Sequence, residues 1–359
     1  MRKGHGERDK GKGTRPKGKG PRPKGKGTRA GIVAVVALLL AGCDSPVKPT
    51  PESPTITCPA NVTLRGVPGG TQPVTYPAPV VAGGAAPVNV TCTPGSGAPF
   101  SVGTTAVACN AVDAMSRPAQ CSFTVTLTPL LLSVTKFVAF GDSFTEGQNG
   151  RPGLQGERFV DVPNAYPTKL QFMLNFEYPG QGIVVSNRGK GGELVDAGRL
   201  RLPDVLAQEQ GGALLLLDGY NDLLNWCRPQ DANSAQCAAT INDVVAGLRK
   251  MIQIGKVPAY GIKYLFVSTL TPPGPYLGGD DRRIAGQAII QTNAKLAPMI
   301  QGEGAVVVDP YPAFVGHEAE YVDQDGLHLR PAGYQALADT FFAAIKNTVT
   351  STPGFDSIH

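Results

Sequence analysis

The sequence predicts two folded domains: a small all-β sandwich, then a three-layer α/β domain built around about five parallel strands. Residues 55–128 consist of short, alternating runs rich in Val, Thr, Pro and Gly, which is typical of strands. Residues 134–350 contain five continuous apolar runs separated by segments of helical periodicity, which is typical of a covered parallel sheet. The length of 359 residues allows about two domains, and a hydrophobic content of 42% excludes a wholly disordered chain.

The strands of the first domain are predicted from period-two alternation. Runs such as NVTLRGV and CSFTVTLTP place apolar side chains at every second position, and Gly and Pro interrupt them at short intervals. Because alternate side chains of a strand point to opposite faces, this pattern favours a sandwich of short antiparallel strands with one buried face each.

The strands of the second domain are predicted from runs that are apolar throughout. Segments with helical spacing lie between them, at 241–252 and 288–300, and a last helix begins near Pro331, a residue that suits a first helical turn. A strand with helices on both faces needs apolar residues on both sides, so continuous runs indicate a three-layer arrangement. The runs are KFVAF (136–140), GIVVS (182–186), ALLLL (213–217), KYLFVS (263–268) and AVVVD (305–309).

The charge of the chain is unevenly distributed. Residues 1–30 contain twelve Lys and Arg against Glu7 and Asp9, a net charge of +10, so the remainder carries −5 out of the total of +5. A folded part with a negative balance gives no electrostatic reason to expect a nucleic-acid partner. We interpret the basic segment as a disordered or removed extension rather than an RNA-binding tail.

The residues after this segment indicate export. The uncharged run 31–42 is too short to span a bilayer as a helix but fits the apolar part of a secretory signal peptide. Leu40-Ala41-Gly42-Cys43 resembles the bacterial lipobox, which implies cleavage before Cys43 and a lipid on its thiol. We therefore expect a basic extension and lipoprotein signal peptide at 1–42, a lipidated Cys and Pro-rich tether at 43–54, and an exported, membrane-anchored bacterial lipoprotein. The alternative is general secretory cleavage with an unmodified Cys.

The cysteine count agrees with an oxidising compartment. Seven Cys leave six once Cys43 carries a lipid, enough for three disulfides. Cys227 and Cys237 flank an insert after the third apolar run, and we expect them to pair. The first domain contains four cysteines, Cys58, Cys92, Cys109 and Cys121, which allow three disulfide connectivities. No pair of cysteines has the spacing of a metal site, so we expect no metal.

Four polar, Gly-rich segments lie where the predicted strands end. GDSFT (141–145), NRGKGGE (187–193) and GYND (219–222) follow the first three apolar runs, and DGLH (325–328) comes between the fifth run and the last helix. Ligand sites in open parallel sheets form outside the carboxyl ends of the strands. The sequence therefore predicts that these segments converge on one edge of the sheet.

The residues in these segments suit acyl transfer. A serine hydroxyl is a weak nucleophile until an imidazole takes its proton, and Ser143 with His328 can form such a pair. Asp325 lies three residues before His328, close enough to fix the tautomer of the ring and to stabilise the imidazolium. The oxyanion needs preorganised donors, for which the backbone N–H groups of Ser143 and Gly192 and the side-chain amide of Asn221 are candidates.

Other residues compete for these roles. Asp323 is the main alternative to Asp325, but it lies five residues from His328. We expect His317 on the surface or at the rim of the pocket. Trp226, the only tryptophan, lies beside the predicted catalytic edge, and an ordinary packed aromatic is the preferred interpretation over a pocket-lining one.

The four segments resemble, in order, the four signature blocks of the SGNH (GDSL) hydrolases over about residues 134–350. The resemblance implies a flavodoxin-like sheet, with Ser143 as nucleophile, Gly192 and Asn221 as oxyanion donors, and Asp325 and His328 as partners of the serine. Arg188-Gly189-Lys190 departs from the small or apolar residues usual in the second block, and the spacing from Asn187 favours Gly192 over Gly191 as donor. The G-x-S-x-G elbow of the α/β-hydrolases is absent around Ser143.

The first domain resembles the hyalin-repeat (HYR) family of immunoglobulin-like domains. The segments that carry this resemblance are ITCPANVT, VTCTPGSG, VGTTAVACNAVDA and QCSFTVTL. It implies adhesion or spacing without catalytic residues, and by analogy the pairs Cys58–Cys109 and Cys92–Cys121. We interpret the domain as a stalk.

Together these features predict an exported, lipid-anchored serine esterase that acts as a monomer, through an acyl-enzyme and without a cofactor. Its substrate would be an acyl lipid, an acetylated glycan or a simple ester, and the insert at 223–240 and the loop at 271–281 would shape its pocket. The alternatives are an adhesin or carbohydrate-binding protein with a vestigial hydrolase domain, and an acyltransferase using the same triad. The complete set of Ser, His and Asp argues against the vestigial domain.

Overall fold

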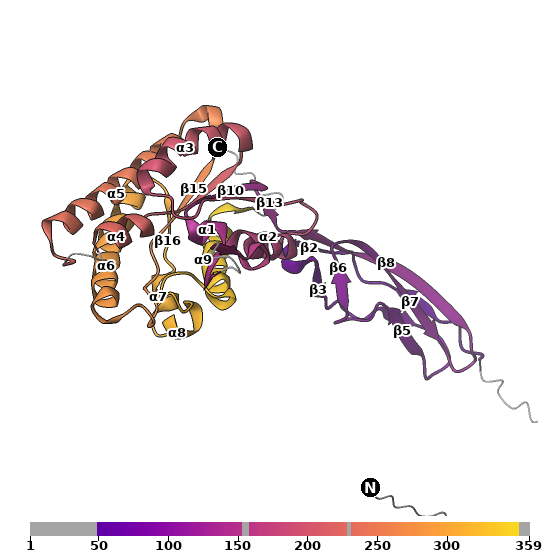
Figure 1. Cartoon of the computed structure of the whole chain (residues 1–359). Coiled ribbons are helices and arrows are strands. Elements are labelled where there is room, and N and C mark those ends of the chain that lie inside the picture. The colour runs from indigo at the N-terminus through magenta and orange to yellow at the C-terminus, as the bar shows by residue number, and fades with distance from the viewer. Residues whose placement is uncertain (1–48, 153–157, 228–230, 352–359) are drawn as a thin grey trace, which may run out of the picture. The chain divides into compact units, whose positions relative to one another are not determined.

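The computed structural model describes residues 49–152, 158–227 and 231–351 (Figure 1). The predicted signal peptide and Cys43 lie outside this range. No helix in the described part of the chain combines the length and the apolar character needed to cross a bilayer.

The first domain is all-β, as predicted. A four-stranded sheet has the order β2-β8-β7-β5, and two further pairs are β1–β4 and β3–β6. All these pairs are antiparallel except β2–β8, which runs parallel, with Val62 opposite Val125. The prediction of antiparallel strands is therefore wrong for this pair. The elements are β1 (Thr55–Thr57), β2 (Val62–Val67), η1 (Pro68–Gly70), β3 (Thr71–Pro73), β4 (Val80–Ala82), β5 (Asn89–Thr93), β6 (Pro99–Ser101), β7 (Gly103–Val112) and β8 (Pro118–Pro129).

Alternation along β8 builds the core of this domain. Phe123, Val125 and Leu127 are buried, while Thr124 and Thr126 between them are only partly covered. This is the period of two that a strand with one buried face requires. The buried side chains pack with others of β6 and β7 into a hydrophobic cluster that belongs to this domain alone.

The disulfides of this domain correct the prediction. The pairs are Cys58–Cys121 and Cys92–Cys109, whereas the family analogy implied Cys58–Cys109 and Cys92–Cys121. Cys92 and Cys109 stand directly opposite each other on β5 and β7, with Cα atoms 4.1 Å apart. Cys109 also stands opposite Cys121 on β8, and the sulfurs of Cys58, Cys109 and Cys121 lie within 4.8 Å of one another. Proximity alone thus permits more than one pairing.

The second domain contains a five-stranded parallel sheet in the order β13-β10-β14-β15-β16. Numbered along the chain this order is 2-1-3-4-5, the flavodoxin-like arrangement, so the predicted fold class is confirmed. The second strand begins two residues later than predicted and extends through Asn187 to Gly189. The strands are β10 (Lys136–Gly141), β13 (Val184–Gly189), β14 (Ala213–Leu217), β15 (Tyr264–Ser268) and β16 (Val306–Val308).

Helices cover both faces of this sheet (Figure 1). One group packs α2 against α9, and the other packs α3 and α6 against α5. Part of the predicted insert and loop is helical, because α4 ends at Trp226, α5 begins at Ala235 and α6 begins at Gly279. The helices are α1 (Ser143–Glu146), α2 (Tyr166–Glu177), α3 (Val195–Glu209), α4 (Tyr220–Trp226), α5 (Ala235–Gly255), α6 (Gly279–Gly302), α7 (Tyr311–Phe314), α8 (Glu318–Tyr321) and α9 (Pro331–Val349).

Short elements complete the domain. Strand β9 pairs with β17 near the two ends of the domain, and β11 pairs with β12 after α1. The short elements are β9 (Leu131–Leu132), β11 (Gln148–Pro152), β12 (Arg158–Val160), η2 (Val162–Asn164), η3 (Pro258–Tyr260) and β17 (Thr350–Ser351).

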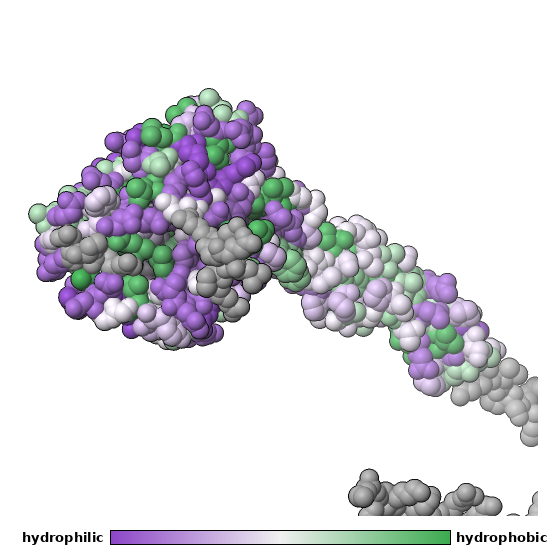
Figure 2. Space-filling model, viewed as in Figure 1, coloured by the Kyte–Doolittle hydropathy of each residue, from purple (hydrophilic) through white to green (hydrophobic). Residues whose placement is uncertain are grey.

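Cys227 and Cys237 form the expected disulfide between the end of α4 and the start of α5. On the face shown in Figure 2, hydrophilic and hydrophobic residues are interspersed over the domain.

Candidate active site

Ser143 lies where the central part of the sheet ends. Strand β10 stops at Gly141, and Asp142 caps the following turn because its Oδ1 accepts a hydrogen bond from the Phe144 N–H at 3.0 Å. Ser143 is the first residue of α1 and its side chain is largely buried. Its backbone N–H is therefore in the first turn of a helix, where such groups are free of intrahelical partners.

The structure brings Ser143, His328 and Asp325 into contact. The Ser143 Oγ lies 3.0 Å from Nε2 of His328, and Nδ1 of the same ring lies 2.6 Å from Oδ2 of Asp325. Because an ionised carboxylate can only accept, Nδ1 carries the proton and Nε2 is left to accept the hydrogen of the serine hydroxyl. This is the arrangement that a serine nucleophile and its base require.

Asp325 is held in the ionised state. Burial alone would raise its pKa, but the hydrogen bond from His328 and the backbone N–H of Leu327 outweigh burial and keep the pKa below its ordinary value. Its Oδ1 accepts from the N–H groups of both Leu327 and His328, at 3.0 and 2.9 Å. The carboxylate therefore remains available to stabilise a positive charge on the imidazole.

The side chains of the competing residues make other contacts. The Asp323 carboxylate faces Arg330, with 3.7 Å between Oδ1 and Nε, although the backbone N–H of Asp323 donates to the His328 carbonyl oxygen at 2.7 Å. His317 is about half exposed, pairs with Glu320 at 3.5 Å and stacks on Tyr321. Trp226 is 52% exposed at the end of α4, which contradicts its interpretation as an ordinary packed aromatic.

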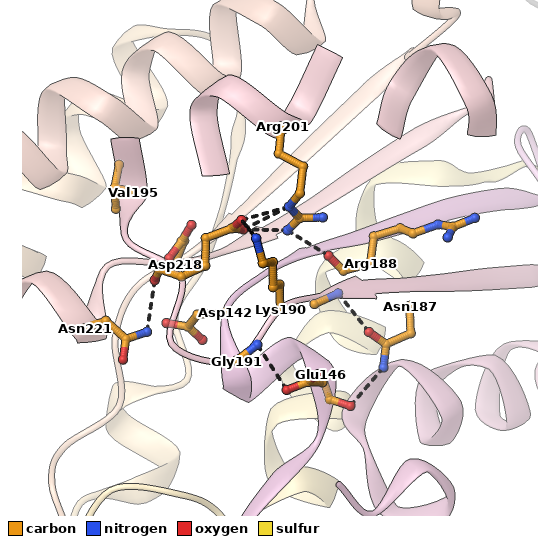
Figure 3. A network of polar contacts seen from close by, with 12 residues as sticks. Asp142, Glu146, Asn187, Arg188, Lys190, Gly191, Val195, Arg201, Asp218 and Asn221 are labelled. Atoms are coloured by element: carbon orange, nitrogen blue, oxygen red, sulfur yellow. Dashed lines mark hydrogen bonds and ion pairs between the residues drawn. The ribbon is translucent and has the colours of Figure 1, made fainter. Parts of the chain in front are cut away.

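The predicted oxyanion donors come from two further strand ends. Gly192 follows β13 with a φ of +76°, a left-handed conformation that glycine adopts readily. Asn221 is the second residue of α4, and its Nδ2 donates to the Glu193 carbonyl oxygen at 3.0 Å, which leaves its second hydrogen for a ligand. The Gly191 N–H donates to Glu146 Oε2 at 3.0 Å (Figure 3), and this supports Gly192 as the donor.

Two family models match the chain. Residues 139–336 match the GDSL-like lipase/acylhydrolase family model, and residues 50–127 match the HYR domain model. The chain belongs to the GDSL-like lipase/acylhydrolase family. It is thus a hydrolase of carboxylic esters. No curated protein matches it.

Solved structures similar to this GDSL hydrolase include an acetylxylan esterase from Geobacillus stearothermophilus, at 22% identity and a TM-score of 0.45, over 59% of this chain and 94% of that one. An α/β hydrolase from the metagenome of Lake Arreo, Spain, has 19% identity and a TM-score of 0.43, over 60% and 96%. A lipase/acylhydrolase from Enterococcus faecalis has 20% identity and a TM-score of 0.45, over 60% and 96%.

Two buried aspartates lie beneath the candidate site of the hydrolase. Gly141 on β10 and Leu217 on β14 are paired across the sheet. Asp142 follows the first and Asp218 follows the second, so the two aspartates stand side by side. Burial, reinforced by the charge of Asp222, raises the pKa of Asp142 to about 7. Burial, and after it the charge of Asp142, raises the pKa of Asp218 well above its ordinary value.

An aromatic stack joins the serine turn to α4. The rings of Phe144 and Tyr220 are nearly parallel, with centroids 4.0 Å apart, and the Tyr220 hydroxyl bonds to Thr271 Oγ1 at 2.6 Å. Ser143 and Asn221 are the direct neighbours of the two stacked residues. The stack therefore connects the turn that holds the predicted nucleophile to the helix that holds the predicted oxyanion donor.

A small apolar pocket lies beside the stack. Its volume is about 340 Å³ including the space at its mouth, and it is lined by segments from α4, the loop after β15, α6 and the loop that carries His328. The predicted insert and loop both contribute to it. Its lining residues are Tyr220, Leu223, Leu224, Pro272, Pro273, Leu277, Ala285, Ile289, Gly326 and Leu327.

Sequence reasoning missed part of this site. The sequence predicts no role for Glu193 in the second segment, yet its carbonyl oxygen accepts a hydrogen bond from the amide of Asn221. Arg201 forms a bidentate contact with Glu193 from α3, and nothing in the sequence distinguishes it from Arg199 two residues earlier. Asp218 directly follows the apolar strand β14, and its position there does not distinguish it as a residue of the site. Only the fold brings these residues to the site.

Proposed function

We propose that this GDSL hydrolase is an exported, lipid-anchored serine esterase whose catalytic triad is Ser143, His328 and Asp325. The observation that carries the proposal is the continuous chain of contacts from the Ser143 Oγ through both ring nitrogens of His328 to Asp325, at 3.0 and 2.6 Å. Export and lipidation are supported by the apolar run 31–42 and the lipobox-like residues that end in Cys43.

The geometry suits a two-step reaction. Ser143 Oγ attacks the ester carbonyl carbon as its proton passes to Nε2 of His328, and the carbonyl oxygen becomes an oxyanion. The N–H groups of Ser143 and Gly192 and the second hydrogen of the Asn221 amide would hold that oxyanion. Transfer of the proton from His328 to the leaving alkoxy oxygen breaks the carbon–oxygen bond and leaves an acyl-enzyme. Water, deprotonated by the same ring, then releases the acid and regenerates the serine.

The substrate is proposed to have a short acyl group. The apolar pocket beside Tyr220 is small, and Leu327, the residue before the proposed catalytic histidine, is among the residues that line it, so the pocket suits a short acyl group better than a long one. The HYR domain would serve as a spacer, which favours an ester in the cell envelope or an acetylated polysaccharide over a soluble metabolite.

The test is an assay of purified residues 44–359 on aryl esters with acyl groups of graded length and on acetylated glycans. We expect hydrolysis that is fastest for the shortest acyl groups, and a loss of at least about 10⁴-fold in kcat for Ser143→Ala. Ser122→Ala, at an exposed position of β8, is the matched control and should retain full activity. Retained activity in the Ser143 variant would refute the triad, and conversion of added alcohols into new esters would indicate an acyltransferase.

A further inference from the structure

The Glu193 carboxylate lies in the loop after β13 and has two cationic partners, Arg201 and Lys190. Its carboxylate is almost wholly buried and accepts from Arg201 Nε at 2.9 and 3.1 Å and from Nη2 at 2.5 Å. The same Nη2 donates to the carbonyl oxygen of Arg188 at 3.1 Å (Figure 3). Lys190 lies further away, at 3.6 Å, with its side chain mostly in solvent. Arg201 is thus the principal partner of this carboxylate.

Arg201 is itself fixed against the sheet. Its guanidinium carbon lies 4.1 Å from the centroid of the Phe140 ring, a distance at which a cation is attracted to an aromatic face. Phe140 belongs to β10, three residues before Ser143. The Arg201 side chain therefore connects α3, the loop after β13 and the strand that leads to the nucleophile.

The backbone of Glu193 is linked to both proposed oxyanion donors. Its nitrogen is bonded to the carbonyl carbon of Gly192, the residue that carries the proposed N–H donor, and its own carbonyl oxygen accepts from Nδ2 of Asn221 at 3.0 Å. Two residues on, the Val195 N–H donates to Asp222 Oδ2 at 3.1 Å. A change in the position of residue 193 would therefore move the residue that carries the Gly192 N–H and the acceptor that holds the Asn221 amide.

We propose that Glu193 and Arg201 are a positioning pair that sets the oxyanion donors of the hydrolase, an inference that rests on the proposed function. Neither side chain touches the reacting atoms. Without Arg201 the Glu193 carboxylate would be buried without its principal partner, which is strongly unfavourable, so residue 193 would turn toward water and carry both donors with it. Donors that have lost their preorganised positions stabilise a transition state less while binding the substrate almost as well.

A purely structural ion pair makes a different prediction. It would change the stability of the fold and leave the folded fraction of the enzyme fully active. A positioning pair lowers kcat in the folded enzyme, with little change in KM. The two roles are therefore separated by kinetics on folded protein together with a local measure of the loop.

The test compares Arg201→Met with Arg199→Met. Arg199 lies on the same helix and pairs with Asp196 at 2.7 Å, but Asp196 is exposed and touches neither donor. For aryl acetate hydrolysis we expect Arg201→Met to lower kcat about 10- to 100-fold with KM within about threefold, and Arg199→Met to leave both within about twofold. Guanidinium ions added to Arg201→Ala should restore part of kcat. A kcat of Arg201→Met within twofold of wild type would overturn the proposal.

Backbone hydrogen exchange gives a readout that does not depend on activity. Residues 189–195 should exchange faster in Arg201→Met than in wild type or Arg199→Met, and unchanged exchange there overturns the proposal. If Arg201→Met does not fold, Glu193→Met, which removes both acceptors of Arg201 and leaves no buried carboxylate, undergoes the same two measurements with the same criteria. If wild type hydrolyses none of the esters, the proposed function is refuted but the positioning role is not. The hydrogen exchange of residues 189–195 would still decide whether the pair positions the loop.

Discussion

Asp142 shows how one residue at the site couples stability to pH. Its folded-state pKa of about 7 lies above the ordinary aspartate value of about 3.9. Between these pH values the folded chain holds a proton that the unfolded chain has released, so the free energy of unfolding falls as pH rises, by at most about 1.4 kcal/mol per pH unit for one group.

Asp142→Asn should flatten this dependence. The asparagine oxygen can still accept from the Phe144 N–H, but the side chain cannot ionise, so we expect the variant to be more stable than wild type above pH 7. Urea denaturation at pH 5 and pH 8 measures the effect. Asp339→Asn, at an exposed position of α9, is the control. If the free energy of unfolding changes between pH 5 and pH 8 by the same amount in the variant and in wild type, Asp142 does not titrate in this range.

Asn221 carries the second residue-scale prediction. Asn221→Ala removes one of the proposed oxyanion donors and should lower kcat about 10²- to 10³-fold with little effect on KM. Asn225→Ala, at an exposed position of the same helix, should have no effect. Steady-state kinetics on an aryl ester compare the two, and near-full activity of the Asn221 variant would remove it from the donor set.

Residues at the ends of predicted strands, or within one turn of each other, could be predicted, and residues that reach the site from the side of a helix could not. Asp325 and His328 lie within one turn of chain, so their contact followed from the sequence. Arg201 reaches Glu193 because α3 packs beside β10, and Arg199 carries the same charge on the same helix without touching the site. The sequence contains no signal that separates the two arginines.

Strands were predicted better than the connections between them. The run 213–217 coincides with β14, since a central strand is buried on both faces and is apolar throughout. The second strand was placed too early, because Asn187, Arg188 and Gly189 are polar or small and yet continue its ladder beside β10. Disulfide pairing depends on register across β5, β7 and β8, which a linear pattern of cysteines does not contain.

Gly189 tests the close packing of β13 against α1. A Cβ atom at this position would lie 2.0 Å from the backbone nitrogen of Glu146, where backbone meets backbone and no side chain can move aside. Gly189→Ala should therefore destabilise the fold by roughly 3 kcal/mol or more, or prevent folding. A Cβ at Gly279, the first residue of α6, meets nothing within 4 Å.

Thermal or urea denaturation separates the two glycines. Gly279→Ala should change the free energy of unfolding by no more than about 1 kcal/mol. A Gly189→Ala protein as stable as wild type would show that the end of β13 can move away from α1. The approach of the second segment to the serine turn would then be adjustable rather than fixed.

At the scale of the whole molecule, the residues of the candidate site all come from the α/β domain. They lie between Gly141 and His328 in sequence and meet at one sheet edge, as the positions of the strand ends predicted. The all-β domain has its own hydrophobic core and two disulfides and contributes no side chain to the proposed triad. This separation supports the proposal that the all-β domain is a spacer for the enzyme domain.

Attachment through Cys43 is the prediction that concerns the molecule as a whole. In a bacterial host that processes lipoproteins, the full-length chain grown with radiolabelled palmitate should incorporate the label, and Cys43→Ser should not, because the thiol is the proposed site of lipid transfer. Ser45→Ala, two residues further on, should incorporate the label like wild type. Incorporation is a sharper readout than membrane fractionation, since an uncleaved apolar run at 31–42 could also hold the chain at the membrane. An unlabelled wild type would leave general secretory cleavage as the explanation of the N-terminal pattern.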